Sequence, residues 1–259
     1  MLILIHTSKT MRSDVLTLPA VSEPQYLAEA RELVSYVRTL SVNQLASCMQ
    51  VSEVLAKKVQ TQLLDWQGQG RASAVSSFVG DIYSGLQSAQ WDDADIAFAQ
   101  KHLRIVSGLY GVLRPLDAVE PYRLEMGCRL PHEQYKYLDQ FWQTKLVGLI
   151  QPSEVVINLT AVEYSKALVL QLPQAKVITP VFLTMSPKTG EPTFVTVHTK
   201  IARGAFANWL ICNRVSEAAE LERFTDLGYS YSTTLSKPQK PTFVCREFGG
   251  LGLSVRLAT

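Results

Sequence analysis

Short apolar runs mark the candidate strands of this chain. The runs at 2–5 (LILI) and 155–159 (VVINL) carry no charged residue, which is typical of strands buried on both faces. Residues 176–183 form a further strand-like stretch, and Thr160 with Glu163 has the spacing of a capping box that would start a helix before it. Strand, helix and strand in this order predict a βαβ unit with a parallel pair of strands.

Longer segments repeat apolar residues at three and four positions, as on the buried face of a helix. Helices are therefore predicted over about 25–40, 42–49, 53–66, 93–106, 199–213 and 217–224. Ser22 and Gln25 would form the capping box of the first helix, and a tight connection at Val51-Ser52 makes the second and third a helical hairpin. Further strands are expected at 193–198 and 242–248.

These elements predict a single compact α/β domain over 1–248, with a mixed sheet, a parallel core and surrounding helices. The tail 249–259 is expected to lie outside it. Of the 259 residues, 47% are hydrophobic and 19% charged, as in ordinary globular proteins. Because no apolar run approaches the roughly 20 residues that span a bilayer and MLILI is too short for a signal peptide, we expect a cytoplasmic protein without membrane contact.

The four cysteines, Cys48, Cys128, Cys212 and Cys245, lie far apart and form no CxxC pair. We therefore expect reduced thiols, no disulfide framework, no metal site and no cofactor. The net charge of +2 and the isoelectric point of about 8.3 permit nucleic-acid binding without favouring it. Any DNA-binding surface must come from local clustering of basic residues.

The densest mixture of charged and aromatic residues is in 101–127 (KHLRIVSGLYGVLRPLDAVEPYRLEMG). Glycines and prolines in this segment fix turns, and side chains held on rigid turns often form ligand sites. Arg114, Arg123 and Glu125 are the candidates here. The alternative is a structural turn in which the arginines pair with carboxylates of the same segment.

This segment also resembles the YaaA family of bacterial peroxide-stress proteins. MLILIHTSKT, FVGDIYSGL, YLDQFW, VVINLTAVEYSKAL and KIARGAFANWLICNR match the same family in order, so the resemblance covers about 1–248. It implies a mixed α/β fold of the family's own type, a cytosolic location and DNA binding through a helix-hairpin-helix. It also implies a role in limiting oxidative damage linked to intracellular iron.

The loop 6–10 (HTSKT) follows a buried strand, and its hydroxyls and lysine can bind an anion. A capped turn with a solvated lysine is the alternative. Lys9 and Thr10 match the family, whereas 6–8 depart from its usual Ser-Pro-Ala. In FVGDIYSGL, Asp81 and Tyr83 are candidates to contact a ligand, or Asp81 only stabilises a turn. Val79 stands where the family usually has lysine.

In KIARGAFANWLICNR, Lys200 and Arg203 share one face near a predicted helix start. Two cations oppose the helix dipole there, so we expect an anion or acidic residues nearby; solvated surface cations are the alternative. The hairpin 42–66 would place Lys57 and Lys58 behind its turn, but it lacks the glycines common in DNA-binding hairpins, and Glu53 would repel phosphate. Only the resemblance raises DNA binding above an ordinary helical hairpin.

The leading hypothesis is a monomeric protein that binds duplex or distorted DNA without strong sequence specificity, through Lys57 and Lys58. The alternative is an enzyme acting on a nucleotide or nucleobase, and a third is a small-anion-binding regulator of iron handling. The side chains expected to line a common cleft are Lys9, Thr10, Asp81, Tyr83, Arg114, Arg123, Glu125, Lys200 and Arg203. No hydrolase or metalloprotease motif assigns catalytic residues.

Overall fold

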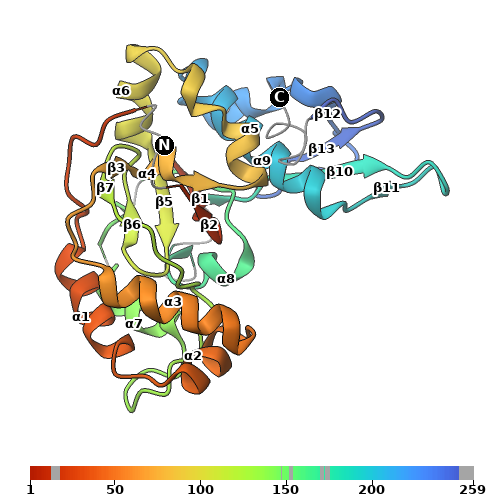
Figure 1. Cartoon of the computed structure of the whole chain (residues 1–259). Coiled ribbons are helices and arrows are strands. Elements are labelled where there is room, and N and C mark those ends of the chain that lie inside the picture. Colours follow the sequence, from red (N-terminus) through yellow and green to blue (C-terminus); the bar gives the residue numbers. More distant parts are fainter. Residues whose placement is uncertain (13–17, 147, 152–153, 170–171, 173–175, 251–259) are drawn as a thin grey trace.

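The apolar run at the start of the chain becomes the central strand of the main sheet in the computed structural model (Figure 1). The structure describes residues 1–12, 18–146, 148–151, 154–169, 172 and 176–250. The strands are β1 (Leu2–His6), β2 (Thr10–Met11), β3 (Ala72–Ser73), β4 (Phe78–Val79), β5 (Leu103–Ser107), β6 (Gly111–Leu113), β7 (Ala118–Val119), β8 (Val156–Asn158), β9 (Val177–Ile178), β10 (Val181–Met185), β11 (Pro192–Thr193), β12 (Tyr229–Tyr231) and β13 (Thr242–Cys245).

Helices surround these strands. They are α1 (Leu27–Val37), α2 (Val42–Met49), α3 (Glu53–Asp65), α4 (Ala74–Ser77), α5 (Asp81–Leu86), α6 (Asp93–His102), α7 (Leu138–Lys145), α8 (Val162–Ser165) and α9 (Thr196–Cys212), with 3-10 turns at Ser88–Gln90, Ala218–Arg223 and Asp226–Gly228. No helix in the part of the chain that the structure describes is long and apolar enough to cross a membrane.

The main sheet has the strand order β6-β5-β1-β8-β9 within the described residues. β1 is parallel to β5 on one side and to β8 on the other, and β8 is parallel to β9. Only β6 runs antiparallel, next to β5. The predicted βαβ unit and the mixed α/β fold with a parallel core are therefore confirmed. Leu2 to Ile5 are buried, as is typical of a central strand in a parallel sheet.

A second sheet, β11-β10-β13-β12, forms an arm that extends away from the main sheet (Figure 1). α9 connects the two regions, since it contacts β10 as well as α5 and β1. Phe182 of β10, Phe206 of α9 and Phe243 of β13 are fully buried and stack or meet edge to face. This aromatic core holds the arm together.

Close packing of α5 on α9 fixes the position of the arm relative to the main sheet. A Cβ atom at Gly85 would collide with the carbonyl oxygen of Ile201, and one at Gly204 would collide with that of Ile82. Both glycines are required because the two helix backbones touch. The contact brings the start of α9, with Lys200 and Arg203, toward the end of β1.

Several sequence predictions are corrected. Ser22 caps no helix: its hydroxyl donates to Asp117 at 2.7 Å, and α1 begins only at Leu27. The helix predicted over 93–106 ends at His102, and β5 begins at Leu103, because the apolar run that follows is buried on both faces of the sheet.

The strand predicted over 176–183 is two strands in different sheets. Pro180, which lacks an N–H for a ladder, separates β9 from β10. The strand predicted over 193–198 stops at Thr193, and α9 begins three residues earlier than expected. The hairpin helices α2 and α3 match their predicted bounds to within one residue. Residues 251–259 of the predicted tail lie outside the described residues.

Candidate functional site

The parallel strands β5, β1 and β8 end side by side, and polar residues gather at these carboxyl ends. The chain crosses from β1 to β5 on one side and later to β8 on the other. Such a switch point leaves a crevice at the strand ends, which is where α/β proteins bind ligands. His6 ends β1, Ser107 ends β5 and Asn158 ends β8.

His6 is held in one orientation by its neighbours. Its Nδ1 accepts the Ala161 N–H at 3.2 Å, and its ring lies 4.8 Å from that of Tyr164. Burial and then the charges of Arg203 and Lys200 lower the pKa of His6 to about 3. His6 is therefore neutral at physiological pH, with its proton on Nε2.

Arg203 brings a partly desolvated positive charge to this place. Burial lowers the pKa of its guanidinium, and its buried Nε has no hydrogen-bond partner among the described residues. Buried donors are nearly always paired in folded proteins. An acceptor supplied by a ligand would satisfy Arg203, with the exposed Lys200 three residues before it on α9.

Tyr83 links α5 to the same crevice. Its hydroxyl donates to the carbonyl oxygen of His6 at 3.1 Å. Asp81 opens α5 and is half-buried, directly after Gly80, which faces the side chain of Ser8. The pairing of Thr10 in β2 with Val79 in β4 also holds loop 7–10 against this segment.

A second group of charges lies around Glu125, which is almost fully buried. Its Oε1 accepts from Arg123 Nη2 at 3.1 Å and lies 3.5 Å from Lys9 Nζ. Glu163 of α8 belongs to this group: burial and then the charge of Glu125 raise its pKa, and Lys9 opposes the rise. Tyr164, next in the chain, connects the group to His6.

The cations of this group open onto a groove of about 350 Å³ beside α3. Its lining is formed by Lys9, Thr10, Met11, Leu55, Lys58, Val59, Gln62, Tyr122 and Arg123. Lys58 thus joins Lys9 and Arg123 from a separate element. Lys57 is equally exposed but does not line the groove.

Comparison with known proteins decides the family. The family model described as "Peroxide stress protein YaaA" matches residues 1–235. The chain belongs to the YaaA family. It is 48% identical to a protein of Salinispora tropica named "UPF0246 protein", over 99% of this chain and 98% of the relative. It is 36% identical to a similarly named protein of Shewanella baltica, over 95% of this chain and all of the relative.

One predicted site residue of this YaaA-family chain lies elsewhere. Arg114 follows β6, which runs antiparallel to β5, so Arg114 lies near the start of β5 rather than near its end. Its Nη2 pairs with Asp117 at 3.1 Å and also donates to the carbonyl oxygen of Glu23. The alternative interpretation of 101–127, arginines paired with carboxylates of the same segment, holds for Arg114 with Asp117 and for Arg123 with Glu125.

The sequence interpretation missed Glu163, to which it gave only a capping role. The predicted box does not form, because Thr160 donates its hydroxyl to Asn158 at 2.7 Å and α8 starts after Ala161 without a side-chain cap. A carboxylate and an aromatic hydroxyl directly after the buried strand β8 were the available signal. In the YaaA fold this position is the carboxyl edge of the sheet.

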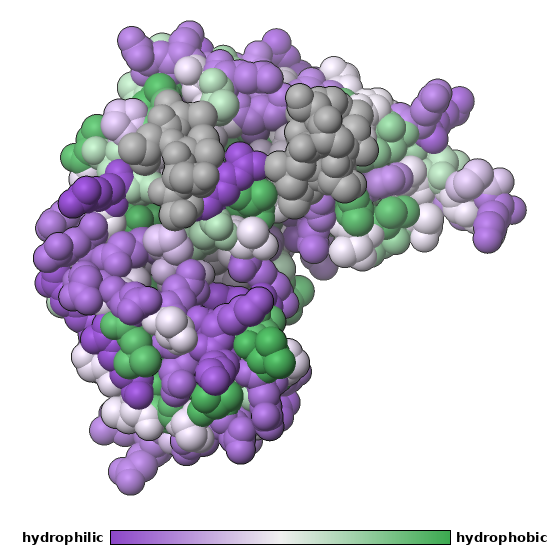
Figure 2. Space-filling model, viewed as in Figure 1, coloured by the Kyte–Doolittle hydropathy of each residue, from purple (hydrophilic) through white to green (hydrophobic). Residues whose placement is uncertain are grey.

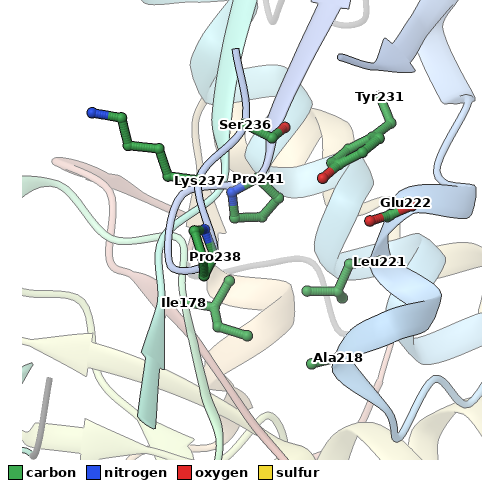
Figure 3. Close-up of a pocket in the computed structure, with 9 residues that line it drawn as sticks. All are labelled: Ile178, Ala218, Leu221, Glu222, Tyr231, Ser236, Lys237, Pro238 and Pro241. Carbon is green, nitrogen blue, oxygen red and sulfur yellow. The ribbon is translucent and has the colours of Figure 1, made fainter. Parts of the chain in front are cut away.

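The arm carries a different hollow of about 290 Å³ (Figure 3). Ile178, Ala218 and Leu221 form an apolar side, while Lys237 extends away from the centre (Figure 3). No ion pair links the charged residues of this hollow within the described chain, so it lacks the convergent charges of the crevice. The crevice and the groove beside α3 are therefore the candidate functional site.

Proposed function

We propose that this protein acts in peroxide resistance by binding DNA through phosphates in the groove beside α3. The observation that carries the proposal is the meeting of Lys9, Lys58 and Arg123, from three separate parts of the chain, on one groove. The three cations line the groove, whereas the nearby carboxyls of Glu125 and Glu163 do not. Local clustering thus supplies the positive surface that the nearly neutral net charge does not.

The surroundings also suit an extended polyanion. The molecule is hollowed between the part that carries α1, α2, α3 and α7 and the arm that carries β10 and β11 (Figure 2). Hydrophilic side chains dominate the exposed face of the helical part, with only isolated apolar residues such as Val54 and Leu64. Backbone contacts of this kind carry no sequence information, which fits binding without strong sequence specificity.

The hairpin turn contributes backbone geometry. Gln50 adopts a left-handed conformation (φ 53°) at the end of α2, where a glycine is common, and Ser52 caps α3 by accepting the Leu55 N–H. α2 and α3 therefore form a rigid hairpin along one side of the groove. We propose that it contacts DNA mainly through Lys58, with Lys57 contributing less.

A salt-dependent titration against duplex, bubble and single-stranded DNA tests the proposal. The logarithm of the affinity should fall linearly with the logarithm of the salt concentration. On duplex DNA each phosphate contact should contribute about 0.9 log unit of affinity per tenfold increase in salt. Lys9→Ala should bind all sequences more weakly and with a shallower slope. Lys101→Ala, at an exposed position in the last turn of α6, is the matched control and should behave as the parent. Absence of binding at low salt, or equal effects of both variants, would refute the groove.

A second candidate is an enzyme that acts on a nucleotide or on a base displaced from the duplex. The unpartnered Nε of Arg203 beside neutral His6 favours it, as does the Glu163 carboxyl with its raised pKa near Lys9. Groups with shifted pKa values in a crevice are typical of functional sites. Arg203→Gln should then lose peroxide protection in cells while its duplex affinity stays unchanged. Loss of duplex affinity would assign Arg203 to the DNA-binding surface instead.

A further inference from the structure

Two cysteines that are 80 positions apart meet in the fold. Cys48 lies in the last turn of α2 and Cys128 follows Glu125, with 3% and 2% of their surfaces exposed. The N–H of Arg129 donates to the carbonyl oxygen of Cys48 at 3.1 Å, so the two backbones run side by side. This bond places the residue directly after Cys128 against Cys48.

The two thiols are also close enough to interact. A hydrogen bond from the Cys128 thiol lowers the pKa of Cys48, while burial and the charge of Glu125 oppose this shift. The same bond raises the pKa of Cys128. Of the two thiols, Cys48 is therefore the one with the lower pKa. Thiolates, not thiols, react with peroxides and disulfides.

A small cavity lies beside Tyr36, which is a neighbour of Cys48. The buried hydroxyl of Tyr36 has no partner among the described residues, and the charge of Cys48 adds to burial in raising the pKa of Tyr36, so the two groups are close. A cavity of about 20 Å³ adjoins Tyr36. Its lining is formed by Glu32, Leu33, Tyr36, Leu130, His132, Tyr135 and Phe141. That volume holds one water-sized molecule, and hydrogen peroxide is only slightly larger.

We propose that Cys48 and Cys128 are a peroxide-oxidisable pair that closes to a reversible disulfide. In the first step the Cys48 sulfur attacks one oxygen of hydrogen peroxide; the O–O bond breaks, and the departing hydroxide takes a proton to become water. In the second step the Cys128 sulfur attacks the sulfenic sulfur of Cys48; an S–S bond forms, the S–O bond breaks, and a second water leaves with the thiol proton. Two thiols lose two electrons, and one peroxide gains them.

The bond would tie the end of α2 to the segment that carries Arg123 and Glu125. Cys128 lies three residues beyond Glu125, and the backbone N–H of Cys128 donates to the Glu125 carbonyl oxygen at 3.0 Å. Oxidation would therefore crosslink the hairpin α2–α3 to the segment that carries Arg123, a residue that lines the groove. The pairing itself does not depend on DNA binding, so the two proposals can fail separately.

Mass spectrometry of the native parent protein tests the pair directly. After brief exposure to hydrogen peroxide and alkylation of the remaining thiols, digestion should yield a peptide that joins Cys48 to Cys128. Dithiothreitol should reverse it, and Cys212 and Cys245 should remain alkylated. The proposal would be overturned if Cys48 and Cys128 were still fully alkylated after peroxide treatment. It would also be overturned if the linked peptide formed only in protein that had been unfolded beforehand.

Variants order the two steps. Cys128→Ser should stop at a dimedone-reactive sulfenic acid on Cys48, and Cys48→Ser should leave Cys128 unreacted at the same exposure. Cys212→Ser is the matched control and should form the disulfide as the parent does, since the pKa of Cys212 is raised to about 11 by burial and Asp95. Sulfenic acid that appears first on Cys128 would overturn the assigned roles. Far- and near-ultraviolet circular dichroism verifies that each variant is folded.

Discussion

The two ends of β5 carry similar ion pairs with different consequences. At its start, Asp117 is wholly buried and accepts from the Arg114 N–H at 2.8 Å, from Arg114 Nε at 3.1 Å and from the Ser22 hydroxyl at 2.7 Å. At its end, Glu125 shares its charge between Arg123 and Lys9, and the Lys9 side chain remains 64% exposed. The first pair closes a turn, whereas the second leaves cations available on a groove.

The difference shows that an ion pair alone does not identify a site. Asp117 satisfies its oxygens with Arg114 of the same turn and with Ser22, so its pair contributes to folding. The Glu125 group lies where parallel strands end. At the same edge of the sheet the pKa of Glu163 is raised, and the Nε of Arg203 has no hydrogen-bond partner among the described residues. A ligand could satisfy these groups. Four experiments test this comparison.

Asp117→Ala should have the largest effect, and it should act on stability. Removal of the wholly buried carboxylate takes the acceptor away from the Arg114 N–H and the Ser22 hydroxyl, and each unsatisfied buried donor costs about 1–3 kcal/mol. The Arg114 guanidinium is 40% exposed, so its charge stays solvated and adds little to the loss. Urea unfolding measures the loss, and DNA affinity per folded molecule should be unchanged. Glu133→Ala, at an exposed carboxylate, is the control and should stay within about 0.5 kcal/mol of the parent. A loss no larger than that of the control would remove the distinction between the two ends.

His6→Asn should abolish a pH-dependent loss of stability that belongs to the crevice. In the unfolded chain His6 takes up a proton near pH 6.5, whereas the folded pKa is about 3. As pH falls through this window the unfolded state binds more protons, so folding stability decreases, by about 1.4 kcal/mol per pH unit at most and less with partial solvent contact. Unfolding curves between pH 7 and about 4 should diverge between parent and variant; parallel curves would contradict a neutral His6.

Glu125→Gln should strengthen DNA binding. The amide keeps an oxygen that accepts from Arg123 but removes the negative charge beside the groove cations. A unit charge about 4 Å away contributes about 1 kcal/mol in water, which corresponds to roughly fivefold in affinity. Fluorescence anisotropy with labelled duplex measures it at low salt. Weaker binding would show that Glu125 positions the cations instead of competing for them.

Much of this fold is predictable because its signals are local. The buried strands β1 and β8 and the hairpin α2–α3 each follow from a run of neighbouring residues. A turn around Gly108 and Gly111 was predicted, but not that it joins two paired strands of the sheet: the φ of Gly111 is +68°, and a Cβ there would meet the ring of Trp142. That turn reverses the chain between β5 and β6 and so sends Arg114 and Arg123 to opposite ends of the sheet.

The candidate site was predicted only in part for the same reason. Lys9, Arg123 and Glu125 were chosen separately and meet because β1 and β5 end together. The meeting of Cys48 with Cys128 depends on tertiary packing between α2 and a turn 80 residues away. Spacing within the sequence carries no signal for such a contact.

Lys58→Ala compared with Lys57→Ala gives the smallest and sharpest test. Both lysines are exposed neighbours on α3, but only Lys58 lines the groove with Lys9 and Arg123. Loss of one phosphate contact should reduce the slope of log affinity against log salt concentration by about 0.9 in Lys58→Ala. It should also weaken binding a few-fold near physiological salt. Lys57→Ala should change the slope less, because its charge acts from outside the groove through solvent.

Both variants should unfold at the parent's urea concentration, since exposed lysines contribute little to stability. If Lys57→Ala has the larger effect, DNA lies across the outer face of α3 and the groove is not the contact surface. If neither slope changes, the hairpin does not contact phosphate, and the basic residues at the end of β5 then remain as the surface to test, through Lys9→Ala.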